Sequence, residues 1–169
     1  MTGPLVVLVG PMGAGKTTVG RLLAERLGVG FRDTDDDVEA AEGRTVSDIF
    51  VESGEEHFRA AERAAVARGL TEHEGVLALG GGAVMAEETR ALLEGQRVVF
   101  LRVGLADAAS RVGLGASRPL LLGNVRGTMK TLLDERTPVY EGVATAVVDT
   151  DGLTPSDVAD AVLEMVPHD

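Results

Sequence analysis

The chain has 169 residues, 25% of them charged, and a net charge of −11. This length predicts one domain, residues 1–169, with a substantial core. The absence of cysteine excludes disulfides, zinc–thiolate sites and a cysteine nucleophile. The negative net charge argues against nucleic acid or an anionic membrane as a partner. Because no signal-like or membrane-spanning stretch is found, we expect a cytoplasmic protein.

Apolar strand patterns alternate with helical patterns along the whole chain. In chain order, strands are predicted at 5–10, near 30–33, and at 76–79, 97–103 and 145–149. Helices are predicted at 16–27, 35–42, 46–52, 55–70, 86–94, 105–112, 125–140 and 155–166. This alternation favours an α/β fold of three layers, with a five-stranded parallel sheet between helices.

The first strand leads into a phosphate-binding loop. Residues 10–17 read Gly-Pro-Met-Gly-Ala-Gly-Lys-Thr, a full match to G-x-x-x-x-G-K-[ST] between a strand and a helix. Backbone amides and the positive helix end then face phosphates. Lys16 is expected to reach the β- and γ-phosphates, and the Thr17 hydroxyl to bind Mg²⁺. The predicted nucleotide contacts in the loop are Gly13, Ala14, Gly15, Lys16, Thr17 and Thr18.

A run of acidic residues, 33–37, follows the second strand. Ligands of open α/β sheets bind beyond the carboxyl ends of the strands, so these carboxylates should face the site. We expect Asp33 and Asp35 to point opposite ways and do different work, one holding Mg²⁺ through water and the other binding substrate hydroxyls. Asp36 and Asp37 are expected to be solvated carboxylates at a helix N-terminus, and capping alone could also explain the run.

Two weaker signals come next. On one helix, Arg59 and Glu62 have the i, i+3 spacing of an ion pair, which could orient the arginine for a carboxylate or be an ordinary surface pair. After the third strand, Gly80, Gly81 and Gly82 would let a ligand approach the backbone, although a plain glycine turn explains them as well.

The second half of the chain supplies further arginines. Residues 113–124 contain three glycines and a proline around Arg118, and we interpret them as a small lid that closes over the site rather than a mobile surface loop. Arg111 is predicted to end a helix before this lid, and the segment from Arg136 to Tyr140 to end the helix after it. Three arginines from three separate elements could stabilise the negative charge that is spread over the transition state of phosphoryl transfer.

Taken together, these motifs resemble the shikimate kinases, small P-loop kinases of the nucleoside monophosphate kinase-like class. The matching blocks are GPMGAGKTTVG, DTD, FRAAE, LGGGAV, RPLL and RTPVY, in the family's order between residue 10 and about 150. The resemblance implies transfer of the ATP γ-phosphate to the 3-hydroxyl of shikimate, in the route to chorismate and aromatic amino acids. It also implies a monomer that binds ATP, shikimate and Mg²⁺.

The resemblance also assigns roles to individual residues. Asp35 would bind the shikimate hydroxyls and serve as the candidate base, and Arg59 and Arg136 would clamp the carboxylate beside Gly80, Gly81 and Gly82. Phe50 and Phe58 would form an apolar wall, and Glu62 would hold Arg59. The remaining roles fall to Arg118 at the phosphates, to Arg111 and Pro155 at adenine, and to Thr17 and Asp33, the latter through water, at Mg²⁺.

Two other functions remain open from the sequence. A gluconate kinase of the same class would share the loop and lid, and its carboxylate substrate could use an arginine clamp. A nucleotide-dependent regulatory protein would bind nucleotide with little turnover, and it would leave Asp35, Arg59 and Arg136 without a task.

Overall fold

A computed structural model describes residues 3–104, 107 and 125–166 of the chain. All five described strands form one parallel sheet with the order β2-β3-β1-β4-β5. In chain order the strands are β1 (Val6–Val9), β2 (Phe31–Asp33), β3 (Val76–Ala78), β4 (Val98–Arg102) and β5 (Ala146–Asp149). The predicted α/β class with five parallel strands is confirmed.

The helices also follow the predicted pattern, with small shifts at their ends. They are α1 (Lys16–Leu27), α2 (Thr34–Glu42), α3 (Val46–Ser53), α4 (Glu55–Glu72), α5 (Glu87–Leu93), α7 (Val125–Val143) and α8 (Pro155–Leu163). A short 3₁₀ helix, η1 (Ala83–Met85), was not predicted. The helix expected at 105–112 and the lid expected at 113–124 lie outside the described residues, apart from Asp107. No described helix is long and apolar enough to cross a membrane.

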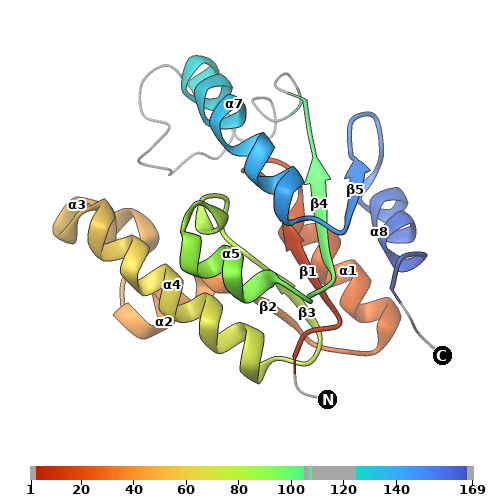
Figure 1. The fold of residues 1–169 in the computed structure, drawn as a ribbon, viewed down its shortest axis with the longest axis horizontal. Coiled ribbons are helices and arrows are strands. Elements are labelled where there is room, and N and C mark those ends of the chain that lie inside the picture. The colour runs from red at the N-terminus through yellow and green to blue at the C-terminus, as the bar shows by residue number, and fades with distance from the viewer. Residues whose placement is uncertain (1–2, 105–106, 108–124, 167–169) are drawn as a thin grey trace.

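Two apolar clusters cover the two faces of the sheet because successive side chains of a strand point to opposite sides. Val6 and Leu8 of β1 pack in one cluster with residues of α1 and α8. Val7 and Val9 pack in the other with residues of α4, α5 and α7. Figure 1 shows the resulting three layers, with α4, α5 and α7 in front of the sheet and α1 behind it.

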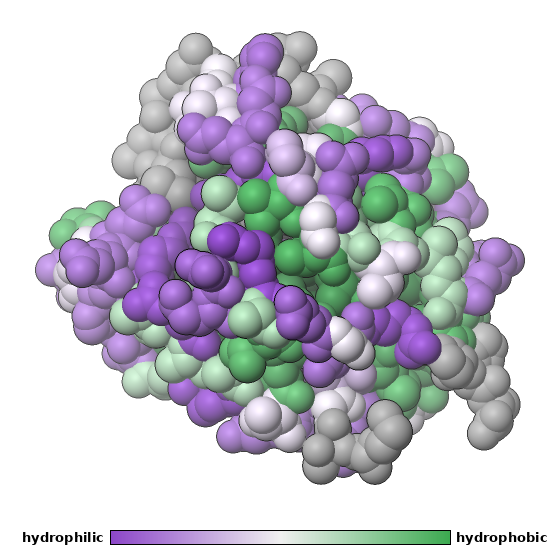
Figure 2. Space-filling model, in the orientation of Figure 1, coloured by the Kyte–Doolittle hydropathy of each residue, from purple (hydrophilic) through white to green (hydrophobic). Residues whose placement is uncertain are grey.

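A third, smaller cluster lies away from the sheet. Val38, Ile49, Phe58 and Ala65 pack together between α2, α3 and α4, which lie side by side at the left of Figure 1. Figure 2 shows that hydrophilic residues cover the left part of this face, whereas hydrophobic residues are visible near its centre. The small cluster therefore supports helices that carry predicted site residues beyond the edge of the sheet.

Tyr140 is a polar residue inside the main core. It is the chain's single tyrosine, its side chain is 0% exposed, and its ring centroid lies 5.0 Å from that of Phe100 on β4. Its hydroxyl donates a hydrogen bond to the carbonyl oxygen of Gly81. Burial raises the pKa of Tyr140 to about 12, against the opposing charge of Arg136.

We predict that Tyr140 stays protonated in the folded protein at pH 10.5, where an unfolded tyrosine ionises. The folded state favours the neutral hydroxyl, so its stabilisation is complete below pH 10 and is lost between pH 10 and about 12. A shift of this size corresponds to about 3 kcal/mol of unfolding free energy. Absorbance at 295 nm reports the tyrosinate directly, since no second tyrosine and no tryptophan contribute.

Denaturant unfolding at pH 9 and pH 11 gives the matching stability change. The Tyr140→Phe variant is the control, because it should lack this part of the pH dependence. Ionisation of the native tyrosine near pH 10 would contradict the prediction.

Candidate functional site

The loop between β1 and α1 has the geometry of a phosphate cradle. Gly15 adopts a left-handed conformation (φ 88°), which favours glycine, and α1 begins at the next residue. Within the described chain no side chain caps this helix, so its N-terminus faces the cavity in front of it. The Lys16 ammonium donates hydrogen bonds to the carbonyl oxygens of Gly10 and Pro11, at 2.7 and 3.0 Å, and so lies across the loop.

A large cavity opens in front of this loop, and we call it the loop cavity. Its volume is about 560 Å³. All six predicted nucleotide contacts of the loop line it, together with Asp33, Asp35, Gly80 and Gly81. Further lining comes from Thr150 and Leu153, which follow β5, and from Pro155 and Val158 in the first turn of α8, whose N-cap is Thr154. An elongated ligand with phosphates at one end and an apolar group at the other fits this lining.

Asp33 connects the phosphate loop to the next strand. One carboxylate oxygen accepts a hydrogen bond from the Thr17 hydroxyl at 3.1 Å, and the other accepts from the Asp35 amide at 2.8 Å. The second bond makes Asp33 the N-cap of α2. Thr17 and Asp33 are hard oxygen donors at the mouth of a phosphate cradle, which fits Mg²⁺ held mainly by water and phosphates. The described residues contain no cluster of three or more metal-binding side chains that would form a closed protein cage.

The expectation that Asp33 and Asp35 point opposite ways is wrong. Side chains two residues apart on a strand share a face, so strand geometry gave no ground for that expectation. In the structure β2 ends at Asp33 and Asp35 lies in the first turn of α2. Both carboxylates line the loop cavity. Asp37 also differs from the expectation of a solvated carboxylate, because it forms a 2.6 Å ion pair with Arg32.

Two arginines from different helices meet at one glycine. A Cβ atom at Gly82 would lie 2.7 Å from Nη1 and 2.8 Å from Nη2 of Arg59, and 2.9 Å from Nη2 of Arg136. These distances are too short for any side chain, so glycine is what lets both guanidiniums approach the backbone. The two planar donor groups converge on one small volume, an arrangement that suits a carboxylate.

A second, smaller pocket surrounds these arginines, and we call it the arginine pocket. Its lining residues come from four helices and two loops: Met12, Asp35, Val46, Phe50, Phe58, Arg59, Glu62, Gly81, Gly82 and Arg136. The rings of Phe50 and Phe58 lie 4.9 Å apart and form one apolar wall. Gly80 lines the loop cavity rather than this pocket, which differs from the expectation that all three glycines share one pocket.

Arg59 is held in place by acidic neighbours on its own helix. Its Nη1 lies 2.8 Å from Oε1 of Glu62, and its Nε lies 3.5 Å from Oε2 of Glu55. Glu62 is 3% exposed, and burial raises its pKa while the charge of Arg59 opposes the rise. A buried partner distinguishes this pair from an ordinary surface ion pair, since it fixes the direction of the guanidinium.

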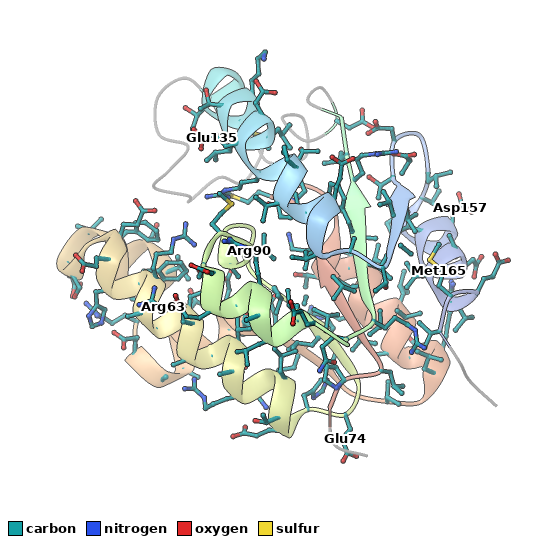
Figure 3. The ribbon with its side chains drawn as sticks, viewed as in Figure 1. Arg63, Glu74, Arg90, Glu135, Asp157 and Met165 are labelled. Atoms are coloured by element: carbon teal, nitrogen blue, oxygen red, sulfur yellow. The ribbon has the colours of Figure 1, made fainter. Side chains whose placement is uncertain are left out.

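Arg136 lies in the C-terminal part of α7, as predicted, although the helix runs three residues beyond the expected end at residue 140. The helix continues past Pro138 to Val143. Arg136 is 7% exposed and faces the pocket, whereas its neighbour Glu135 is exposed on the outer side of α7 (Figure 3). Arg111 and Arg118, which the sequence placed near the nucleotide, lie outside the described residues.

Three residues line both cavities and mark the boundary between them: Met12, Asp35 and Gly81. The carboxylate of Asp35 lies beside Gly80, where a Cβ atom would be 2.6 Å from its Oδ1. A group bound between the two cavities would therefore meet this carboxylate. Met12 was not singled out from the sequence, because it occupies a freely variable position of the loop motif and carries no signal of its own.

Comparison with known proteins agrees with this geometry. The shikimate kinase family model matches residues 12–167. A shikimate kinase from Salinispora arenicola is 64% identical over 92% of this chain and 93% of its own length, and one from Streptomyces coelicolor is 57% identical over 98% and 97%.

A solved structure of similar fold is that of shikimate kinase from Acinetobacter baumannii in complex with shikimate. It has a TM-score of 0.92 and 36% identity, and the match covers 98% of this chain and 93% of that one. With a family model and relatives that match nearly its whole length, this chain belongs to the shikimate kinase family.

Proposed function

We propose that the protein transfers the γ-phosphate of ATP to the 3-hydroxyl of shikimate, giving shikimate 3-phosphate and ADP. The observation that carries the proposal is the pair of guanidiniums at Gly82, next to a phosphate cradle and sharing Asp35 with it. The loop cavity would take ATP, and the arginine pocket would take the carboxylate of shikimate. The expected partners are thus ATP and shikimate, and the acidic net charge argues against nucleic acid and anionic membranes.

The arrangement supports in-line attack of the bound hydroxyl on the γ-phosphorus. Phosphoryl transfer depends mainly on positioning and on stabilising spread negative charge. Asp35, at the boundary of the two cavities, would orient the hydroxyl and accept its proton late in the reaction. Lys16 would bind the phosphates, in place of its present bonds to Gly10 and Pro11.

Mg²⁺ is the proposed cofactor, with Thr17 as a ligand and Asp33 as a partner through water. It would supply positive charge at the phosphates of ATP. Arg118 at the phosphates, Arg111 at adenine, a lid at 113–124, a monomeric state and a cytoplasmic location stay predictions from the family resemblance. Pro155 lies in the wall of the loop cavity, where the adenine is expected.

An assay of ADP release with different acceptors tests the proposed function. We expect ADP formation with shikimate, confirmed by mass spectrometry of shikimate 3-phosphate, and little with gluconate or nucleoside monophosphates. Comparable turnover with gluconate would favour the gluconate kinase alternative. Tight nucleotide binding without transfer to any acceptor would favour a regulatory protein. The family match favours shikimate over both.

We predict that Arg59→Lys raises the KM for shikimate by about tenfold or more, because lysine cannot form the two parallel hydrogen bonds of a guanidinium. The kcat should change less. Arg63→Lys is the matched control: Arg63 lies one turn further along α4, its side chain is 41% exposed, and it pairs with Glu88 at 3.4 Å on the surface (Figure 3). An unchanged KM in Arg59→Lys would argue against the carboxylate clamp.

We predict that Asp35→Asn lowers kcat by about a hundredfold while the fold is kept, since the amide can neither accept the proton nor hold the hydroxyl in the same way. Asp36→Asn is the control, because this neighbour is exposed and lines neither cavity. Circular dichroism and thermal unfolding check the fold of both variants. Near-normal turnover in Asp35→Asn would remove this residue from the mechanism.

A further inference from the structure

Two buried hydroxyl groups bind the backbone of the Gly80–Gly82 turn from different elements. The Gly80 amide donates a hydrogen bond to Oγ1 of Thr34 at 3.1 Å. The carbonyl oxygen of Gly81 accepts a hydrogen bond of 2.5 Å from the Tyr140 hydroxyl. Both side chains are 0% exposed. The turn is therefore fixed to α2 on one side and to α7 on the other.

Tyr140 also lies near Arg136, which is one helical turn before it on α7. Both side chains approach the same glycine: a Cβ atom at Gly81 would lie 3.6 Å from Nη1 of Arg136, and the carbonyl oxygen of Gly81 accepts the hydrogen bond of the Tyr140 hydroxyl. Among the described residues no carboxylate lies within ion-pair distance of Arg136, whereas Arg59 has Glu55 and Glu62. The neutral hydroxyl therefore fixes the glycine turn beside Arg136 without neutralising the charge of that guanidinium, which leaves the charge for an anion in the pocket.

Thr34 plays the corresponding part for Asp35, the next residue. Its hydroxyl holds the first turn of α2 against Gly80, and the Oδ1 atom of Asp35 lies close to that same glycine. A displacement of this turn would change the distance between the carboxylate and the boundary of the two cavities. Small displacements at a reacting group cost large factors in rate.

We propose that Thr34 and Tyr140 are positioning residues with separate effects: Tyr140 sets the binding of shikimate through Arg136, and Thr34 sets turnover through Asp35. The inference rests on the proposed function, since it assumes that shikimate is the acceptor. It goes beyond that function because neither hydroxyl is expected to touch a substrate; each acts through the glycine turn and one charged neighbour.

The Tyr140→Phe variant tests the first half. Removing the hydroxyl leaves the Gly81 carbonyl oxygen without its donor and frees the turn beside Arg136, so both the KM and the calorimetric Kd for shikimate should rise by about tenfold. The kcat and the KM for ATP should stay within about threefold of wild type. Phenylalanine keeps the ring contact with Phe100, so the fold should survive.

A spectroscopic measurement covers the case in which this variant does not fold. Because Tyr140 is the single tyrosine, incorporation of 3-fluorotyrosine labels this position alone in the otherwise unchanged protein. Its ¹⁹F resonance should shift on titration with shikimate and saturate at the calorimetric Kd. A resonance that ignores saturating shikimate would overturn the role of Tyr140.

The Thr34→Val and Thr34→Ser pair tests the second half. Valine keeps the shape but leaves the Gly80 amide without its acceptor, so kcat should fall by about tenfold while the Kd for shikimate stays within about threefold. Serine restores the hydroxyl and should restore kcat. Thr145→Val is the control, because that hydroxyl bonds to the amide and carbonyl of Val98 at the opposite end of the sheet.

The outcomes separate this inference from the proposed function. Wild-type protein that gives no shikimate-dependent ADP would overturn the proposed function itself. Active wild type with an unchanged Kd in Tyr140→Phe, or with equal kcat in the valine and serine variants, would overturn this inference alone. A variant could instead lose affinity for ATP and shikimate equally, to the same extent as Thr145→Val and in step with its fall in Tm. Such a result would show that the residue has a structural role only, and it would also overturn this inference.

Discussion

The site depends on one steric constraint: charged side chains approach the Gly80–Gly82 turn more closely than a Cβ atom would permit. Asp35 reaches Gly80, while Arg59 and Arg136 reach Gly82, and all three would lie within 3.0 Å of a Cβ atom there. A side chain at either glycine would push apart groups that come from three different helices. The turn thus brings a base candidate and two cations together because it contributes only backbone.

The order of the strands explains why this turn lies where it does. β3 is flanked by β2 and β1, and in a parallel sheet the carboxyl ends of all three meet at one edge. The phosphate loop follows β1, the glycine turn follows β3, and Asp33 with α2 follows β2. Three motifs far apart in the sequence therefore become neighbours through topology alone, and Asp35 lies at the boundary between the two cavities.

Much of the fold could be predicted from the sequence, because buried parallel strands consist of short β-branched runs and because helix ends carry cap residues. Gly28 and Thr154 are examples: glycine is a common C-cap and threonine a common N-cap, and in the structure they cap the end of α1 and the start of α8. The start of α2 was misplaced by one residue, although Asp33 is itself a common N-cap type that could have marked it. The one-residue shift left Asp35 in the predicted helix; the expected opposite directions of Asp33 and Asp35 had a different cause, since side chains two residues apart on a strand share a face.

The candidate site was harder to predict where its properties depend on burial. The spacing of Arg59 and Glu62 is the same in a surface pair and in a clamp, and only the 3% exposure of Glu62 distinguishes them. Tyr140 was missed because the segment was interpreted through its arginine alone; the i, i+4 spacing from Arg136 was the available signal.

The different neighbours of Arg59 and Arg136 have a consequence for anion binding in this acidic protein. Arg59 forms ion pairs with two carboxylates, whereas Arg136 forms none with the described residues and has a neutral phenol nearby, so the two arginines contribute unequal net charge to the same pocket. Electrostatic attraction for an incoming anion should come mainly from Arg136, and Arg59 should contribute chiefly directional hydrogen bonds.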